Sequence, residues 1–572
     1  MGLHPEVAAL LAAWREPPAD DAELRQRISA TVAALRSLRR DRPELFETEA
    51  ARLVRPAEPG PERSALAAAA APPADPAECL RRVFGFEGFR PGQRELVDAV
   101  LAGRDAIGVL PTGSGKSLTY QLPARMMGGL TLVVSPLIAL MKDQVDAMAR
   151  LGVRATFLNS SLDPEERRRR VAGLRRGEYE IVYAAPEGLE ASVGAVLEGT
   201  RLSLVAVDEA HCISHWGHDF RPAYRNLAGL RARFGGAPVL ALTATATRRV
   251  ASDIAEQLRM RDPVEFRGSF FRPNLLLRAA KKGPEGVSSR EAVLACVRGH
   301  RGESGIVYCI ARRSVESLAE FLRSKLVRAV AYHAGLEPEE RERVQDAFRE
   351  GAADVVVATV AFGMGIDKPD IRFVIHRDMP GSVEGYCQEI GRAGRDGQPS
   401  DCLLLYSYAD VMAHDRLAEA ADDPDVARAQ REQARRMLDL AEASGCRHRL
   451  LARHFDETID PCGESCDRCR PDLGRGAQPV GARGGEGVRA LASAPGAGAA
   501  PFERLRAWRS REARERGVPP FLVFPDATLR AIAEAHPRSL ADLAAVKGVG
   551  PAKLAGFGEA VLGALGPRAG AA

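Results

Sequence analysis

Two polar residues that could take part in chemistry, Lys116 and Ser117, end the segment Leu110-Pro-Thr-Gly-Ser-Gly-Lys-Ser117. Gly113 and Gly115 allow a tight turn in which successive backbone N–H groups point into one concavity suited to a phosphate. In such a loop the lysine reaches the β- and γ-phosphates, and the serine hydroxyl binds Mg²⁺. We therefore predict a nucleotide-binding loop whose contacts are Thr112, Gly113, Ser114, Gly115, Lys116 and Ser117.

A pair of adjacent carboxylates, Asp208 and Glu209, ends the apolar run Leu202–Val207. After a phosphate-binding loop, such a pair supplies the second half of a hydrolytic site. Asp208 would bind Mg²⁺ through water, and Glu209 would polarise the attacking water.

Arginines that could complete this site stand in the segment Gln388-Glu-Ile-Gly-Arg-Ala-Gly-Arg-Asp396. Arg392 and Arg395 are three residues apart, so on one helical turn they would point the same way. An arginine that meets a γ-phosphate is worth about 10³–10⁵ in rate. We expect Gln388, Arg392 and Arg395 to act in catalysis, and the alternative is two surface arginines beside a glycine turn.

The segment before the phosphate loop, Phe89-Arg-Pro-Gly-Gln93, could bind a nucleotide base. The Gln93 amide can pair with the donor and the acceptor on the edge of adenine. Arg90 would stack over the base, and Phe89 would support it.

Aromatic and cationic residues are concentrated in Cys212–Tyr224, although only 5% of the chain is aromatic. Unstacked bases bind to aromatic faces at about 1–3 kcal/mol each, and interleaved cations add to this. We therefore predict a DNA contact, with a small hydrophobic mini-core as the alternative. The predicted DNA-binding residues are His215, Trp216, His218, Phe220 and Arg221.

Four cysteines cluster late in the chain, at Cys446, Cys462, Cys466 and Cys469. One long and two short spacings between successive cysteines suit tetrahedral thiolate binding of Zn²⁺. Four thiolates leave no open position for catalysis. We predict a structural zinc site, with His448 and His454 as surface residues. Arg447, His448, Arg449 and Arg453 would face phosphates.

Apolar runs that can form buried parallel strands precede these polar segments. In the first half of the chain they cover 106–110, 130–134, 180–184, 202–207 and the start of 240–247. A helix is expected to begin at Leu118. A strand at 305–309, a helix at 312–322 and strand-then-turn segments at 330–335 and 355–359 indicate a second α/β unit. Because ligands bind outside the carboxyl ends of such strands, the polar segments share the working edges of two sheets.

The composition is that of a globular chain of 572 residues with a net charge of +4. This charge is too small to indicate a nucleic-acid partner, so any basic surface must be local. No apolar run approaches the about 18 residues that a membrane span needs, and no secretory signal is visible. Six of the ten cysteines are scattered, unlike a disulfide scaffold. We expect a protein of the reducing cytoplasm that has no membrane contact.

Taken together, the motifs at 89–93, 111–117, 208–224 and 240–247 resemble the RecQ family of DNA helicases, over roughly residues 77–473. His215 stands where the family usually has glutamine. The resemblance implies two tandem RecA-like domains, and that Gly365 and Asp367 help sense the nucleotide. It also implies a winged-helix domain after the zinc site, but the glycine-, alanine- and proline-rich stretch 471–500 indicates a flexible linker instead.

The resulting fold class is α/β with a helical zinc-binding module and a small all-α domain that resembles the HRDC type. Gly548-Val-Gly550 in this last domain could bind a phosphate or form a tight turn. Residues 1–76 would be a partner-docking helix pair or a small helical cap, followed by a linker. The expected parts are the extension 1–76, RecA-like domains 77–278 and 279–410, the zinc-binding domain 411–473, the linker 474–500 and the HRDC-like domain 501–572.

The resemblance implies an ATP-dependent 3′-to-5′ DNA helicase that uses Mg²⁺ and Zn²⁺ and acts in DNA repair, recombination, replication and the SOS response. Single-stranded, tailed or forked DNA would be its substrate. A single-stranded-DNA-binding protein would be a partner, and the chain would be a monomer of the bacterial cytoplasm and nucleoid. An RNA helicase, or an ATP-switched protein that clamps DNA without unwinding it, are the alternatives.

Overall fold

The computed structural model describes most of the chain after residue 74. The described residues are 75–136, 138–159, 162–189, 193–197, 200–214, 221–229, 236–283, 286–359, 362, 368–420, 423–475, 499–516 and 520–565. The helices predicted within residues 1–39, the linker before Pro76 and the linker at 476–498 lie outside these ranges.

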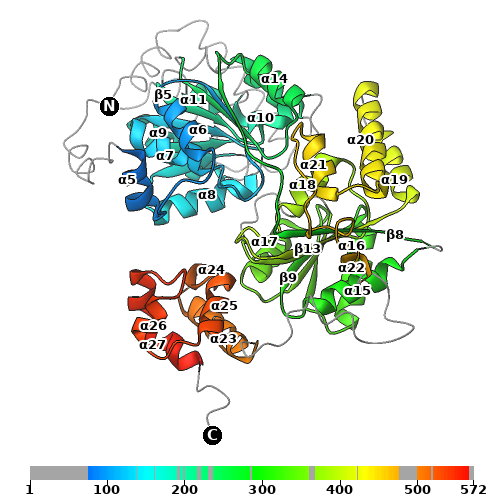
Figure 1. Cartoon of the computed structure of the whole chain (residues 1–572). Helices are drawn as coiled ribbons and strands as arrows, with labels where there is room; N and C mark the ends of the chain where they lie inside the picture. Colours follow the sequence, from blue (N-terminus) through cyan, green and yellow to red (C-terminus); the bar gives the residue numbers. More distant parts are fainter. Residues whose placement is uncertain are drawn as a thin grey trace, which may run out of the picture. The chain divides into compact units, whose positions relative to one another are not determined.

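The first lobe, residues 75–267, is built on a sheet of seven parallel strands in the order β3-β4-β2-β5-β6-β1-β7. Helices flank the strands on their two sides (Figure 1). The strands are β1 (Ala106–Val109), β2 (Leu130–Val134), β3 (Ala155–Leu158), β4 (Ile181–Ala184), β5 (Leu202–Val207), β6 (Val239–Thr243) and β7 (Val264–Arg267). The longer helices are α6 (Gln93–Leu101), α7 (Leu118–Met127), α8 (Ile138–Arg150), α9 (Pro164–Arg176) and α14 (Arg248–Gln257), and the short ones are α5 (Pro76–Cys79), α10 (Pro186–Gly188), α11 (Gly194–Leu197) and α12 (Pro222–Arg225).

The second lobe, residues 275–406, repeats this architecture with six parallel strands in the order β10-β11-β9-β12-β13-β8. Its strands are β8 (Leu275–Lys281), β9 (Ser304–Tyr308), β10 (Ala329–Tyr332), β11 (Val355–Ala358), β12 (Ile371–His376) and β13 (Ser400–Tyr406). Its helices are α15 (Ser289–Gly299), α16 (Arg312–Ser324), α17 (Pro338–Arg349) and α18 (Val383–Ile390).

The central strands are apolar because helices cover both faces of each sheet. Every residue of β1, β2 and β6 is buried, as is every residue of β9, β11 and β12. Buried parallel strands of this kind read as continuous apolar runs, and the predicted α/β class with two tandem parallel sheets is confirmed.

A helical module that carries the four cysteines follows the second lobe. Its helices are α19 (Tyr408–Ala418), α20 (Pro424–Glu442), α21 (Arg447–His454) and α22 (Asp472–Arg475), and α19 packs along α20 (Figure 1). The cysteine loop extends the second sheet. The N–H of Leu277 in β8 donates to the carbonyl of Ser465 (2.9 Å), and the N–H of Asp467 donates to the carbonyl of Leu277 (3.0 Å).

The C-terminal domain consists of α23 (Ala499–Glu515), α24 (Pro520–Val523), α25 (Asp526–Ala535), α26 (Leu540–Ala544) and α27 (Pro551–Leu565). Its core includes Leu505, Phe524 and Ile532. Ser539 caps α26, since its hydroxyl accepts from the N–H of Asp542. Asp526, the first residue of α25, pairs with the buried Arg509 (2.6 Å).

Two predicted boundaries need correction. The division at 278 cuts β8, which pairs along its whole length with β13 of the second sheet, so the second lobe begins at Leu275. Helix α19 begins at Tyr408, before the predicted start of the zinc-binding domain at 411. Both errors arise because an apolar segment near a boundary does not reveal which sheet or helix it will join.

Candidate active site

The phosphate loop connects β1 to α7, which begins at Leu118 as predicted. Gly113 and Gly115 have φ angles of 87° and 82°, a left-handed conformation that glycine adopts without strain. A Cβ on Gly113 would lie 3.1 Å from Cγ of Arg395, so the loop leaves no spare room beside that arginine. The sequence motif thus forms a compact turn at the start of a helix, where backbone N–H groups can bind a phosphate.

Gln93 binds the phosphate loop itself in this structure. Its Nε2 donates to the carbonyls of Ser114 (3.1 Å) and Gly115 (2.9 Å), and its Oε1 accepts from the N–H of Arg90 (2.8 Å). The Arg90 guanidinium donates to the carbonyl of Gly113. Both ends of the Gln93 amide are therefore hydrogen-bonded, and Gln93 and Arg90 together hold the phosphate loop in this conformation. The adenine contact predicted for them and for the half-buried Phe89 stays a prediction.

The carboxylate pair lies where β5 ends, and Asp208 is buried. Burial and then the charge of Glu209 raise the pKa of Asp208 to about 6, while Lys116 opposes the rise. Lys116 of the phosphate loop is thus close enough to Asp208 to act on it electrostatically. Oxygen ligands next to a phosphate-binding lysine are the donor set that Mg²⁺ prefers.

A buried chain of polar groups connects this pair to the end of the neighbouring strand β6. Nδ1 of His211 lies 3.4 Å from a carboxylate oxygen of Glu209 and 3.0 Å from Oγ1 of Thr243. Oγ1 of Thr243 in turn accepts from the N–H of Thr245 (3.2 Å). The hydroxyl of Thr243, at the end of β6, is therefore connected to the carboxylate pair through His211, a residue that the predicted site did not include.

Tyr224 corrects one part of the aromatic-loop hypothesis. Its side chain is fully buried, and its hydroxyl donates to the carbonyl of Asp208 (3.0 Å). It supports the carboxylate pair from within the core and cannot stack on a base. Of the predicted DNA contacts, Arg221 is described and lies next to α12, whereas His215, Trp216, His218 and Phe220 lie outside the described residues, as do Gly365 and Asp367.

The predicted catalytic arginines lie in a tight turn that follows α18, so they do not share a regular helix. Both are nevertheless near one group, since Arg392 and Arg395 each act electrostatically on the buried Tyr308 hydroxyl. Asp396 anchors the end of the turn, because both of its carboxylate oxygens accept from Arg372 at 2.7 Å. The structure brings this turn to the phosphate loop: a Cβ on Gly391 would lie 2.9 Å from Cβ of Thr112.

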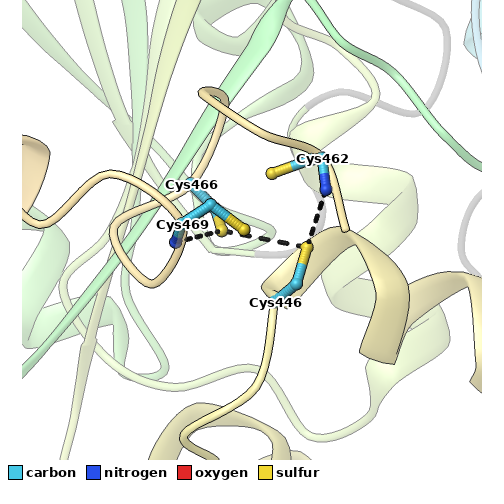
Figure 2. A group of neighbouring side chains, drawn as sticks. All are labelled: Cys446, Cys462, Cys466 and Cys469. Atoms are coloured by element: carbon cyan, nitrogen blue, oxygen red, sulfur yellow. Dashed lines mark hydrogen bonds between the residues drawn. The ribbon is translucent and has the colours of Figure 1, made fainter. Parts of the chain in front are cut away.

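The four cysteines converge from α21 and the loop that follows it (Figure 2). Their sulfur atoms all lie within 4.8 Å of one another, and Sγ of Cys446 is 4.0 Å from Sγ of Cys466. Tetrahedral Zn²⁺ with Zn–S bonds of about 2.3 Å requires sulfurs about 3.8 Å apart. The N–H of Cys462 donates to Sγ of Cys446 (3.2 Å), which stabilises a thiolate. The donor set therefore fits Zn²⁺.

The residues of α21 do not behave as predicted. His448 is only 3% exposed, and its Nε2 bonds the carbonyls of Leu275 (3.0 Å) and Ser465 (3.3 Å). His454 is half-buried against Glu384 (2.7 Å), and Arg447 is buried in a two-point ion pair with Asp467. The surface assignment of the two histidines and the phosphate role of Arg447 and His448 are wrong, because both histidines bond residues of the second lobe and Arg447 pairs with Asp467 inside the module.

Four family models match consecutive parts of the chain. They are the DEAD/DEAH box helicase (residues 90–254), the helicase conserved C-terminal domain (288–397), RecQ zinc-binding (408–470) and the HRDC domain (499–565). Among the described helices, none has both the length and the apolar composition needed to cross a membrane.

Named relatives cover large parts of the chain. The ATP-dependent DNA helicase RecQ of Bacillus subtilis is 35% identical, over 84% of this chain and 97% of its own length. The RecQ helicase of Pasteurella multocida is 44% identical over 68% of this chain, which spans 62% of that relative. A solved structure of Dbp5 L327V from S. cerevisiae, bound to RNA and ADP BeF3, has a TM-score of 0.50 over 70% of this chain and 97% of that one. Because that pair is 14% identical, the likeness shows the fold alone.

Proposed function

Because the chain belongs to the RecQ family of ATP-dependent DNA helicases, we propose that it couples ATP hydrolysis to 3′-to-5′ translocation on single-stranded DNA and to duplex unwinding. The observation that carries this proposal is the meeting of two catalytic loops from different lobes. Arg395 packs on Gly113 of the phosphate loop, and Gly391 packs on Thr112. Arginines in this place can stabilise charge on a γ-phosphate bound by the other lobe.

Mg²⁺ is proposed to accompany ATP at Ser117 and Asp208. The Asp208 carboxyl has a pKa raised to about 6, mainly by burial, and a divalent cation beside it would favour its charged form. Glu209 would orient the water that attacks the γ-phosphate. Lys116 would bind the phosphates, and the arginine turn would stabilise the charge that develops during transfer.

Movement along DNA would follow from cycles of lobe closure and opening. The segment that was predicted to contact DNA follows Glu209 and His211 directly, so a bound strand could influence the hydrolytic residues through the His211–Thr243 contact. Single-stranded DNA next to tailed or forked duplexes is the proposed substrate.

The proposed setting is DNA repair and recombination in a bacterial cytoplasm. A single-stranded-DNA-binding protein as partner, a monomeric state and an association with the nucleoid belong to this proposal.

The test is strand displacement with ATP on duplexes that carry either a 3′ or a 5′ single-stranded tail, in DNA and in RNA. We expect displacement of the 3′-tailed DNA only. Displacement of the 5′-tailed duplex would refute the polarity, and displacement of RNA alone would refute the substrate. ATP hydrolysis without any displacement would refute unwinding and indicate a DNA clamp.

A further inference from the structure

The segment that joins the two lobes, residues 268–274, carries an arginine that none of the motifs above includes. Arg272 lies between the phosphate loop and the arginine turn. Its guanidinium donates to three backbone carbonyls: Thr112 (3.3 Å), Ala393 (3.1 Å) and Gly394 (2.8 Å). The last two carbonyls belong to the residues that separate Arg392 from Arg395.

The environment of Arg272 is unusual for a largely buried cation. Among the described residues, no carboxylate lies within ion-pair distance of its guanidinium. Burial therefore lowers its pKa, and neutral carbonyl groups together with Oδ1 of Asn274 (3.2 Å) supply its hydrogen bonds. A buried charge that is bound only by carbonyls is costly. Its presence here indicates that the hydrogen bonds of the guanidinium have a functional role.

Asn274 holds the same turn from a second side. Its Nδ2 donates to the carbonyls of Gly394 (2.9 Å) and Gln398 (3.0 Å). Gly394 has a φ of 55°, and a Cβ there would lie 2.5 Å from Nδ2 of Asn274. The absence of a side chain at Gly394 therefore allows Asn274 to pack directly against the turn.

The beginning of the joining segment is anchored in the first lobe. The N–H of Gly268 donates to the carbonyl of Val109 (2.8 Å), the last residue of the strand that leads to the phosphate loop. The segment thus runs from the phosphate-loop strand to the arginine turn, and Arg272 binds the loops at both ends of this route.

We propose that Arg272 is a positioning residue for hydrolysis, which holds the turn of Arg392 and Arg395 against the phosphate loop. This proposal rests on the proposed function, because it assumes that these arginines act on a nucleotide. Arg272 itself binds peptide carbonyls and acts through the two arginines. A misplacement of a catalytic group by about 1 Å can cost about 10²-fold in rate.

The experiment uses the full-length protein and compares Arg272→Gln, Arg272→Lys, Arg395→Gln and the double variant Arg272→Gln/Arg395→Gln. Arg328→Gln is the matched control, because Arg328 forms an ion pair with Asp354 at the distant edge of the second sheet. Basal ATP turnover gives kcat and KM, and zinc content and thermal unfolding report the integrity of the fold.

For Arg272→Gln we expect kcat to fall by about 10²-fold with KM changed less than about threefold, since the phosphate loop keeps its contacts with Gln93 and Arg90. Arg272→Lys should keep the melting temperature but not recover kcat, because the single nitrogen of an ammonium cannot span carbonyls that the guanidinium reaches from two separate nitrogens. In the Arg395→Gln background, Arg272→Gln should have a smaller effect than in the wild type, because only Arg392 remains to be misplaced. Arg328→Gln should behave as the wild type.

Three results would overturn the proposal. They are a kcat of Arg272→Gln close to wild type, fully additive effects in the double variant, or a normal kcat in Arg272→Lys. If Arg272→Gln does not fold, the lysine variant decides alone. A wild-type protein that hydrolyses ATP without unwinding DNA would refute the proposed function, while the effect of Arg272 on turnover would still be measured.

Discussion

Raising the pH should destabilise the second lobe because His300 is charged there at neutral pH. Its Nδ1 lies 2.8 Å from a carboxylate oxygen of Glu303, and its Nε2 lies 3.6 Å from one of Asp401. Burial opposes the charge, but hydrogen bonds to Asp401 and Glu303 outweigh it and raise the pKa of His300 to about 9. Arg278 also pairs with Asp401, so these side chains form a largely buried ion network.

The direction and size of the effect follow from the two pKa values of His300. An unfolded histidine has a pKa of about 6.5, so the stabilisation is fully present below about pH 6.5. It is lost as the pH rises through 9, the folded value. A shift from about 6.5 to about 9 corresponds to roughly 3 kcal/mol, which is a large part of the stability of a typical domain.

The assay is urea unfolding of the wild type and of His300→Gln at several pH values between 6 and 10. The wild type should be more stable by up to roughly 3 kcal/mol at pH 6, and the two proteins should converge above about pH 9.5. His414→Gln is the control, because Nε2 of His414 contacts a neutral group, the carbonyl of Met379 (2.7 Å). It measures the cost of replacing an imidazole that bonds a carbonyl rather than carboxylates. A constant difference for His300→Gln, or one that grows with pH, would refute the reasoning.

Other substitutions test the phosphate loop, the cysteine cluster and the buried polar chain. Lys116→Ala should abolish ATP hydrolysis and leave DNA binding intact in a filter or polarisation assay. The control Lys325→Ala, between α16 and β10 of the second lobe, should change neither property. DNA-stimulated turnover in Lys116→Ala would contradict the site assignment. Cys466→Ser should lose zinc by elemental analysis and unfold at a lower temperature, and a normal zinc content would count against the cluster. Thr243→Val should lower the free energy of unfolding by about 1–3 kcal/mol, because the buried His211 ring loses its hydrogen bond to Oγ1 of Thr243, and should slow ATP turnover. An unchanged melting temperature would show that this hydrogen bond is not needed.

The strands and the nucleotide loop could be predicted because their signals are local. Apolar runs of four to six residues predicted β1, β2, β5 and β11 nearly to the residue, and the glycines before Lys116 predicted where α7 begins. Such signals depend on burial and on backbone geometry within a few neighbours. The four-cysteine cluster was equally accessible, since metal coordination requires a specific spacing and residue type.

Partners far apart in the chain could not be predicted in this way. The sequence around His448 has polar neighbours and indicates a surface helix, yet its ring is buried by carbonyls from β8 and the cysteine loop. Gln93 was matched to adenine because its amide has both a donor and an acceptor; the adenine contact stays a prediction, but the carbonyls of the phosphate loop and the N–H of Arg90 offer the same chemistry. Residue type alone does not distinguish between partners of equal chemistry.

The joining segment shows how the zinc module can bear on hydrolysis without any residue of its own in the nucleotide site. Phe270 stacks on Phe455 of the module with ring centroids 4.0 Å apart, and Glu457 accepts from the N–H of Phe270 (2.7 Å). Two residues further on, Arg272 binds the arginine turn. A segment gripped at Phe270 cannot shift freely at Arg272, because only one residue separates them. If Arg272 positions the arginine turn as proposed, the module restricts the positions that this turn can take, and its attachment through Asp467 and His448 would affect catalysis as well as folding.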